Sequence, residues 1–304
     1  MRPLRAGWQI QSSCKLPEKG EVISSTQFVP HDWIAATVPT TVLAAQVAAG
    51  LVKDPYFGMN LRQIPGTTYP LGTIFSRQDM PADSPYACSW WYRTRFTLSK
   101  VERAQRVALH FAGITYRANI WINGHPIASS DQVAGTFRTY RFDLDPTLLA
   151  EDNVIAVEIF APQHGDLAYN WVDWNPAPPD KDMGLWREVS LSFSGAAVIE
   201  HPQVISQVDT ATLDSAQLTV TAEVRNLTDQ TFRGTLAATM ERLRLSQAVE
   251  LAPHESKLLC FAPEQYPQLK LQHPKLWWPA QMGKPNLHTI EFTLESASAA
   301  VDRQ

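Results

Sequence analysis

The stretch Ser89-Trp-Trp-Tyr-Arg-Thr-Arg-Phe-Thr-Leu98 alternates two sets of side chains. A period of two is typical of a β-strand that buries one face. The segments 107–113 and 118–122 repeat this alternation, and Asn123-Gly124 between polar and apolar runs is a strong signal for a type I′ hairpin turn. This region therefore predicts an antiparallel sheet with one buried face.

Three further segments, 137–143, 153–160 and 186–193, have strand patterns, and Asp145-Pro146 supplies an N-cap with a proline in the first helical position of a short turn. Asp143 and Asp145 have the spacing of calcium ligands, but the ligand run stops there, so capping is favoured. Strands at this spacing predict a sandwich of jelly-roll type.

Residues 1–30 mix short β-like pieces, among them Glu21-Val-Ile23, with polar turns, and we expect a strand there that joins the first domain. Between 37 and 50 the chain is rich in alanine. Thr40 or Thr41 can cap a short helix, and Gly50 can end it. The segment 54–87 lacks periodicity and is expected to be a long ordered loop, a kind of segment that often carries function.

The composition indicates two β-rich domains and excludes several classes of partner. A chain of 304 residues exceeds the usual single core, and 44% hydrophobic residues are enough to fill two. The net charge is −4 with scattered Lys and Arg, so we expect no nucleic-acid partner and no binding to an anionic membrane. The longest apolar run, 38–52, is too short and too polar to span a bilayer.

A second strand rhythm begins after Gly195-Ala-Ala197 and has the size of an immunoglobulin-like sandwich. We therefore predict two domains, 1–197 and 198–304. The sequon Asn226-Leu-Thr228 falls where a turn is expected. The strands expected in the second domain are 198–206, 217–224, 232–239, 246–251, 257–261 and 286–294.

The cysteines Cys14, Cys88 and Cys260 lie far apart without metal or redox spacing, so we expect free thiols. The eight histidines form no ligand cluster, and we expect neither a metal nor another cofactor. Residues 1–10 lack the apolar core of a secretory signal. The compartment therefore stays open, and a periplasmic or secreted location is compatible with a trimmed signal.

The segment 170–189 concentrates three tryptophans, three aspartates and three prolines between two expected strands. Indole faces stack on pyranose C–H groups, carboxylates bond to hydroxyls, and prolines stiffen the backbone. A sugar site is one interpretation; a packing loop with capped turns is the other. Asp180 and Asp182 could share one face of an extended segment, but no hydrophobic wall is evident to raise a pKa, so we do not expect them to be catalytic.

Three patches of the sequence resemble glycoside hydrolase family 2, the group of β-galactosidases, β-glucuronidases and β-mannosidases. The resemblance covers nearly the whole chain. The first patch, 38–42 with 48–60, is typical of the β-mannosidase branch. The segment Asp173-Trp-Asn-Pro176 with 178–187 is most similar to exo-β-D-glucosaminidases. The patches are 38–42 with 48–60, 90–96 with 111–124, and Leu276-Trp-Trp-Pro-Ala-Gln-Met-Gly-Lys-Pro-Asn-Leu287.

The resemblance implies an all-β chain, a galactose-binding-like jelly roll followed by an immunoglobulin-like sandwich. In the family a (β/α)8 barrel with two catalytic glutamates follows, and these residues do not include it. Asp173 has the family position that contacts the terminal sugar, although Val172 stands where mannosidases usually have tryptophan. Trp174, Asp54 and Asn60 are further candidates for the rim, with packing as the alternative. The partners implied are a terminal β-linked mannose or glucosamine and the barrel of the same protein.

Three functions remain open. The chain is the non-catalytic part of a family 2 exo-β-glycosidase, which shapes the sugar subsite of a barrel; or it is a free-standing carbohydrate-binding module; or it is a structural spacer. The segment 277–285 favours the first, because in the family it precedes the barrel and lies against it.

Overall fold

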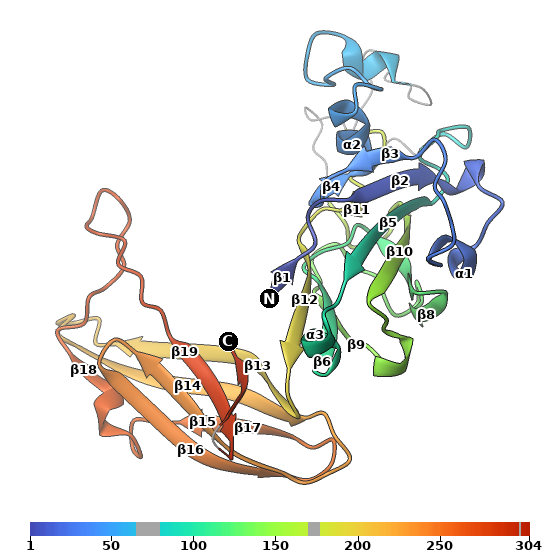
Figure 1. Ribbon diagram of the computed structural model, residues 1–304. Coiled ribbons are helices and arrows are strands. Elements are labelled where there is room, and N and C mark those ends of the chain that lie inside the picture. Colours follow the sequence, from blue (N-terminus) through green and yellow to red (C-terminus); the bar gives the residue numbers. More distant parts are fainter. Residues whose placement is uncertain (65–79, 170–176, 298) are drawn as a thin grey trace. The chain divides into compact units, whose positions relative to one another are not determined.

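The computed structural model describes residues 1–64, 80–169, 177–297 and 299–304, which form two compact units, Met1–Phe193 and Ser194–Gln304 (Figure 1). Both are built from antiparallel strands, so the all-β prediction is confirmed. The predicted domain boundary at 197/198 concerns independent folding and stays a prediction. The long loop expected over 54–87 lies partly outside the described residues. No helix within the described residues is long and apolar enough to cross a membrane.

Unit 1 is a jelly-roll sandwich of a six-stranded and a four-stranded sheet with one large apolar core. The six-stranded sheet has the order β3-β2-β5-β10-β7-β8, and the four-stranded sheet β1-β12-β6-β9. The strands are β1 Arg2–Pro3, β2 Trp8–Ser12, β3 Ile34–Ala36, β4 Thr40–Thr41, β5 Trp90–Thr97, β6 Arg106–Phe111, β7 Arg117–Ile122, β8 His125–Ala128, β9 Tyr140–Asp143, β10 Asp152–Phe160, β11 Gly184–Leu185 and β12 Val189–Ser194.

The local predictions for unit 1 mostly hold. Helix α2, Val42–Ala48, begins after Thr41, whose hydroxyl accepts a hydrogen bond from the Ala44 amide at 3.2 Å, and Gly50 follows it with φ 72°. Asn123 and Gly124 have the positive φ of a type I′ turn between β7 and β8. Asp145 caps the 3₁₀ turn Pro146–Leu148. The strand expected over 137–143 begins only at Tyr140, and the one expected over 186–193 begins only at Val189, as β12.

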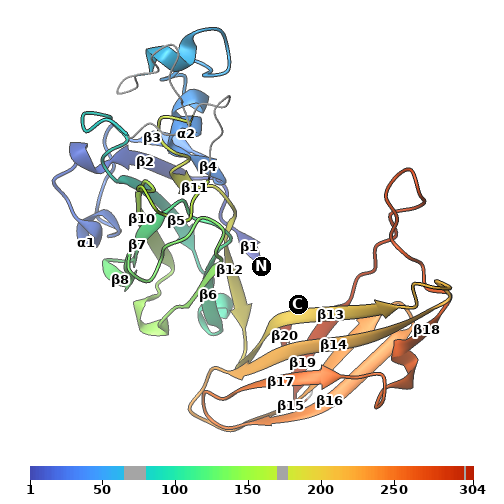
Figure 2. The ribbon, with the colours of Figure 1, turned by 180° about the vertical axis from the view of Figure 1, so that it is seen from behind.

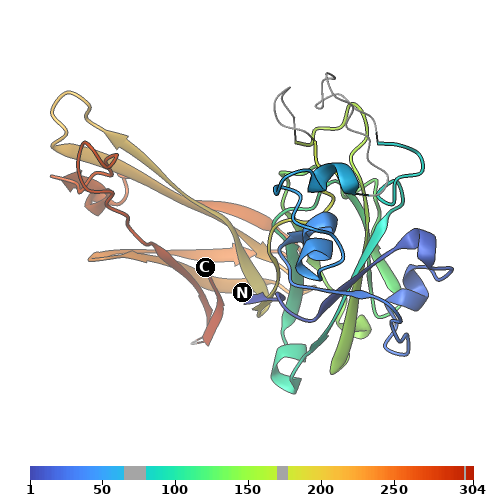
Figure 3. The ribbon, with the colours of Figure 1, turned by 90° about the horizontal axis from the view of Figure 1, so that it is seen from above.

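Strand β5 is buried on both faces at its beginning, which corrects the expectation of one buried face. Trp90 and Tyr92 belong to the main core, whereas Trp91 packs with Ile23 and Ala156 in a second cluster. The cover over that outer face comes from the segment 13–33, blue in Figures 1 and 3, which includes the short helix α1, Gly20–Ile23. The β-like interpretation of 21–23 is therefore wrong.

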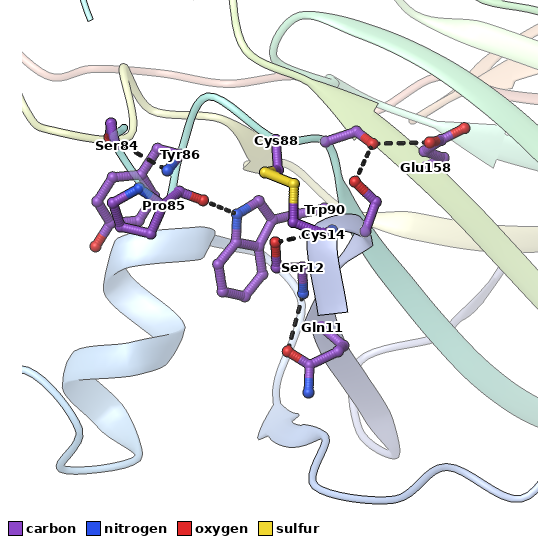
Figure 4. The surroundings of a disulfide bond; sticks show 11 residues. Gln11, Ser12, Cys14, Ser84, Pro85, Tyr86, Cys88, Trp90 and Glu158 are labelled. Carbon is purple, nitrogen blue, oxygen red and sulfur yellow. Dashed lines mark hydrogen bonds between the residues drawn. A yellow bond between two sulfur atoms is a disulfide. The ribbon is translucent and has the colours of Figure 1, made fainter. Parts of the chain in front are cut away.

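Cys14 and Cys88 form a disulfide, which corrects the prediction that both are free thiols (Figure 4). Cys14 lies in the 3₁₀ turn Ser13–Lys15 after β2, and Cys88 lies just before β5, so antiparallel pairing of β2 with β5 brings the two together across 74 residues. Nearby, Ser89 bonds through its hydroxyl to Ser13 at 2.8 Å and to Glu158 at 2.7 Å. Cys260 is a free thiol, as predicted, and its side chain is exposed.

Unit 2 is a sandwich of two four-stranded sheets around its own core. In Figure 2, β14 lies between β13 and β17, while β18 pairs with the far end of β14. Asn226 of the sequon is buried and its amide donates to the Gln230 and Ala252 carbonyls, so it is closed to glycosylation in the folded chain. The strands are β13 Ala197–Val208, β14 Ser215–Asn226, β15 Phe232–Met240, β16 Leu243–Leu251, β17 Ser256–Phe261, β18 Lys270–Gln272, β19 Glu291–Ser296 and β20 Ala299–Arg303.

Candidate functional site

Asp173 and Trp174, the two leading candidates from the sequence, lie outside the described residues. The chain on either side of 170–176 is described, and each side is held by its own set of contacts. These contacts define where the candidate loop leaves and rejoins the sandwich.

The segment before the loop is fixed by an ion pair. The two guanidinium nitrogens Nη1 and Nη2 of Arg117 donate to the two carboxylate oxygens of Asp166, both at 2.6 Å. The amide of Leu167 donates to the Tyr116 hydroxyl at 3.2 Å, and the Gln163 amide donates to Asp166. The hydrogen bond from Arg117 lowers the pKa of Asp166. A bidentate pair of this kind fixes orientation as well as charge, so the chain enters the loop from a fixed position.

An aromatic cluster follows, in which Phe137, Tyr169 and Trp186 meet edge to face. The ring centroids are 5.2 Å apart for Phe137 and Tyr169, and 5.6 Å apart for Tyr169 and Trp186. The Trp186 indole donates to the Thr136 carbonyl at 2.9 Å, and the Arg187 guanidinium lies over its ring at 4.5 Å. Phe137 is 63% exposed, which is unusual for so large an apolar side chain. The cluster offers aromatic surface beside the candidate loop.

The segment after the loop is anchored by Asp180, which is fully buried. Its Oδ2 accepts a hydrogen bond from the Leu43 amide at 2.8 Å, in the first turn of α2, and its Oδ1 accepts from the Asp182 amide at 3.1 Å. Lys181 and Asp182 have φ 50° and 58°, so the segment is a left-handed turn and not the extended piece expected from the sequence. Asp180 therefore joins the loop to the helix end, where a carboxylate is favoured.

Burial raises the pKa of both aspartates to about 6, which corrects the expectation that no apolar surroundings perturb them. Burial also raises the pKa of the Tyr92 hydroxyl, with the negative charge of Asp180 as the second cause. The Asp180 carboxylate accepts hydrogen bonds from backbone amides. Asp182 is half-buried, and its carboxylate accepts no hydrogen bond from the described residues. Asp180 and Asp182 therefore do not form a pair of general acid and nucleophile.

Gly184 lets this segment lie against the sheet. A Cβ there would be 2.6 Å from both the Thr40 carbonyl oxygen and the Tyr92 hydroxyl, and its φ of 154° is rare for other residues. The short strand β11 pairs with β4, and Gly184 also exchanges backbone hydrogen bonds with Thr115. The end of the candidate loop is thus fixed to two neighbouring segments.

Asp54 and Asn60 lie together in one exposed loop after α2. The Asp54 carboxylate accepts from the Tyr56 amide at 2.9 Å, and the Asn60 side-chain amide donates to the Asp54 carbonyl at 2.9 Å. Between them, Tyr56 and Phe57 are 96% and 75% exposed. The helix is seven residues long, so its two ends, one at Asp180 and one near this loop, are about 10 Å apart.

Some of these residues were missed by the sequence reasoning. Arg117 and Asp166 are 49 residues apart and carry no local motif, so only the fold could pair them. Phe137 was assigned to a strand, and its exposure gives no sequence signal. The described residues contain no group of three side chains able to hold a metal ion.

Comparison with known families agrees with both units. Residues 8–169 match the family model described as glycosyl hydrolase 2 galactose-binding domain-like, and residues 197–304 match glycosyl hydrolases family 2. The chain is 30% identical over 297 residues to the exo-β-D-glucosaminidase of Streptomyces avermitilis, which covers 97% of this chain and 31% of that protein. It is 27% identical over 320 residues to the mannosylglycoprotein endo-β-mannosidase of Lilium longiflorum, covering 96% and 32%.

Among solved structures, the exo-chitosanase CsxA of Amycolatopsis orientalis in complex with PNP-β-D-glucosamine has a TM-score of 0.87 at 28% identity, covering 100% of this chain and 33% of that one. A β-glucuronidase of Bacteroides uniformis, with a TM-score of 0.67 at 16% identity, shares the fold. The chain spans about a third of the length of these relatives. With family models matching both of its units, the chain belongs to glycosyl hydrolase family 2.

Proposed function

We propose that this chain is the non-catalytic part of an exo-acting β-glycosidase of family 2, in which it forms one wall of the subsite for a terminal β-linked glucosamine or mannose. The observation that carries the proposal is the anchoring of the 170–176 loop on both sides, by the Arg117–Asp166 pair and by Asp180 at α2. Flanking residues fixed in this way set where the segment leaves and rejoins the sandwich, which suits a wall at a defined position.

The chemistry beside the loop suits a sugar. Aromatic surface comes from the cluster of Phe137, Tyr169 and Trp186, and Asp182 brings a carboxylate that has no hydrogen-bond donor among the described residues. Asp173 is proposed as the acceptor for a hydroxyl of the terminal pyranose or for the ammonium of a glucosaminyl unit. The glucosamine class is favoured by the similarity to exo-β-D-glucosaminidases.

Hydrolysis itself is proposed to belong to a catalytic barrel. Retention needs two carboxyl groups about 5 to 5.5 Å apart across the scissile bond. Of the two neighbouring aspartates, Asp180 is buried under α2 and bonded to amides, so it is unavailable as a nucleophile.

The first experiment assays the chain by itself on aryl β-glucosaminide, β-mannoside and β-galactoside, and no turnover is expected. Turnover that persists through purification and disappears in Asp182→Asn would contradict the proposal.

The second experiment places Asp173→Ala in an enzyme that includes the barrel. Loss of the contact should lower kcat/KM by a factor that corresponds to about 1 to 3 kcal/mol of binding free energy. Asp209→Ala, an exposed turn residue of unit 2, serves as the matched control. An unchanged kcat/KM in Asp173→Ala would indicate that the loop has a packing role instead.

A further inference from the structure

Unit 1 has a cavity of about 650 Å³ on the outer side of its six-stranded sheet, lined by residues of the segment 15–33. We call it the 15–33 cavity. In Figure 1 this segment, with α1, lies beyond β5 and β10 and apart from α2. Its volume is within the range of small-molecule sites, and none of its lining residues belongs to the terminal-sugar subsite proposed above.

The apolar wall of the cavity is fixed to the sheet. Leu16, Phe28 and Trp33 line the cavity and also pack against the cluster that contains Ile23 and Trp91. The Phe28 and Trp33 rings meet edge to face with centroids 6.0 Å apart. The indole N–H of Trp33 is buried and has no hydrogen-bond acceptor within the described residues. Because this N–H is closed to solvent, what Trp33 presents to the cavity is apolar ring surface.

Side chains of the six-stranded sheet hold the backbone of the cavity wall by hydrogen bonds. The buried Arg93 of β5 donates to the carbonyls of Ile23 at 2.8 Å, Ser25 at 3.1 Å and Phe28 at 3.2 Å. Gln11 of β2 donates to the Asp32 carbonyl at 2.7 Å. The disulfide at Cys14 fixes the chain just before the wall begins. The cavity is therefore formed before any ligand arrives, which lowers the entropic cost of binding.

The polar side chains around the cavity are available. They are two acidic, two basic and one amide side chain, and none of them forms a hydrogen bond or ion pair within the described part of the chain. With one lysine against two carboxylates, the lining does not favour a phosphate or a nucleic acid, which select clustered cations. Donors and acceptors beside an indole and a phenyl ring suit a polyhydroxyl ring with apolar C–H faces. The side chains are Lys15, Glu18, Gln27, His31 and Asp32.

We propose that the 15–33 cavity binds pyranose units of a β-linked oligosaccharide, at a second site distinct from the terminal-sugar subsite. Trp33 and Phe28 provide the apolar wall, and the free polar side chains bond to the hydroxyls. The chain would thus hold a saccharide through its own residues, independently of a catalytic barrel.

Isothermal titration of this chain with chitotetraose and with cellotetraose tests the proposal. We expect a dissociation constant on the order of millimolar for at least one of them, as for other open sugar sites with little buried area. Trp33→Phe, which reduces the apolar ring surface, and Glu18→Gln, which removes the charge of one acceptor, should each weaken binding about fivefold. Trp277→Ala, which removes a 58% exposed indole from unit 2, should leave binding unchanged.

Asp173→Ala separates this proposal from the proposed function. If it leaves oligosaccharide binding unchanged while Trp33→Phe weakens it, the second site is supported. Loss of binding in Asp173→Ala alone would place the saccharide in the terminal-sugar subsite and overturn the second site. Absence of heat with both tetrasaccharides also overturns it. If Trp33→Phe lowers the melting temperature, Glu18→Gln and the exposed Gln27→Ala decide between the outcomes. Unchanged affinity in both of these variants refutes the site.

Discussion

Replacing Asp180 with asparagine should change how the stability of unit 1 depends on pH. Asp180 is fully buried and burial raises its pKa from 3.8 to about 6. A carboxyl with a raised pKa in the folded chain contributes stability that is complete below pH 3.8 and is lost as the pH rises through about 6. The asparagine side chain is neutral at every pH and keeps one acceptor for the Leu43 amide, so the variant lacks this contribution.

The size of the effect follows from the two pKa values. Between pH 7 and pH 4.5, a shift from 3.8 to about 6 changes the free energy of unfolding by about 2 kcal/mol. The wild-type chain should therefore gain about 2 kcal/mol relative to Asp180→Asn when the pH is lowered. The Asp180 charge is also the second cause of the raised pKa of Asp182, so its removal adds to the difference in the same direction.

Urea unfolding followed by tryptophan fluorescence measures this difference, because eight of the ten tryptophans lie in unit 1. The control is Asp145→Asn. Hydrogen bonds from Thr147 lower the pKa of Asp145, so its contribution is present at neutral pH and is lost on acidification. The two variants should consequently respond to pH with opposite signs. An equal stability difference between wild type and Asp180→Asn at pH 4.5 and pH 7 would refute the reasoning.

Four other outcomes are expected. Reducing the Cys14–Cys88 disulfide, or replacing both cysteines with serine, should lower the free energy of unfolding by about 2 to 4 kcal/mol, measured by urea titration with and without reductant. Gly184→Ala should cost more than about 2 kcal/mol, because its Cβ meets fixed backbone, and a melting temperature equal to that of wild type would contradict this. His288 donates from both ring nitrogens, to the Lys275 carbonyl and to Glu241, and these hydrogen bonds raise the pKa of His288. Amide protection of the β15–β16 hairpin, whose turn contains Glu241, should therefore fall as the pH rises through that pKa. His288→Ala should abolish this pH dependence. Limited proteolysis should cut near 195–200 and leave two resistant pieces; early cuts inside the first sandwich would show that the boundary is wrong.

Local chemistry made much of the fold predictable. The period of two around residues 89–98 identified β5, because alternation needs only neighbouring side chains. The Asn123-Gly124 turn and the cap at Thr41 depend on backbone conformations that those residues prefer by themselves. The family resemblance added the order of the two sandwiches and the candidate Asp173, which composition could not supply.

What the sequence determined by itself is the class of fold and the positions of most strands, with their turns and caps. Only the tertiary structure decided the pairings between distant residues. The hydrogen bond from the Leu43 amide to the Asp180 carboxylate spans 137 residues, and the disulfide joins two cysteines that have no local signal. Burial has the same origin: the pKa of Asp180 rises because α2 and the sheet exclude water from it. Residues adjacent in sequence determine a side chain's local conformation. The residues that determine its pKa and its hydrogen-bond partners are distant in sequence and come close only when the chain folds.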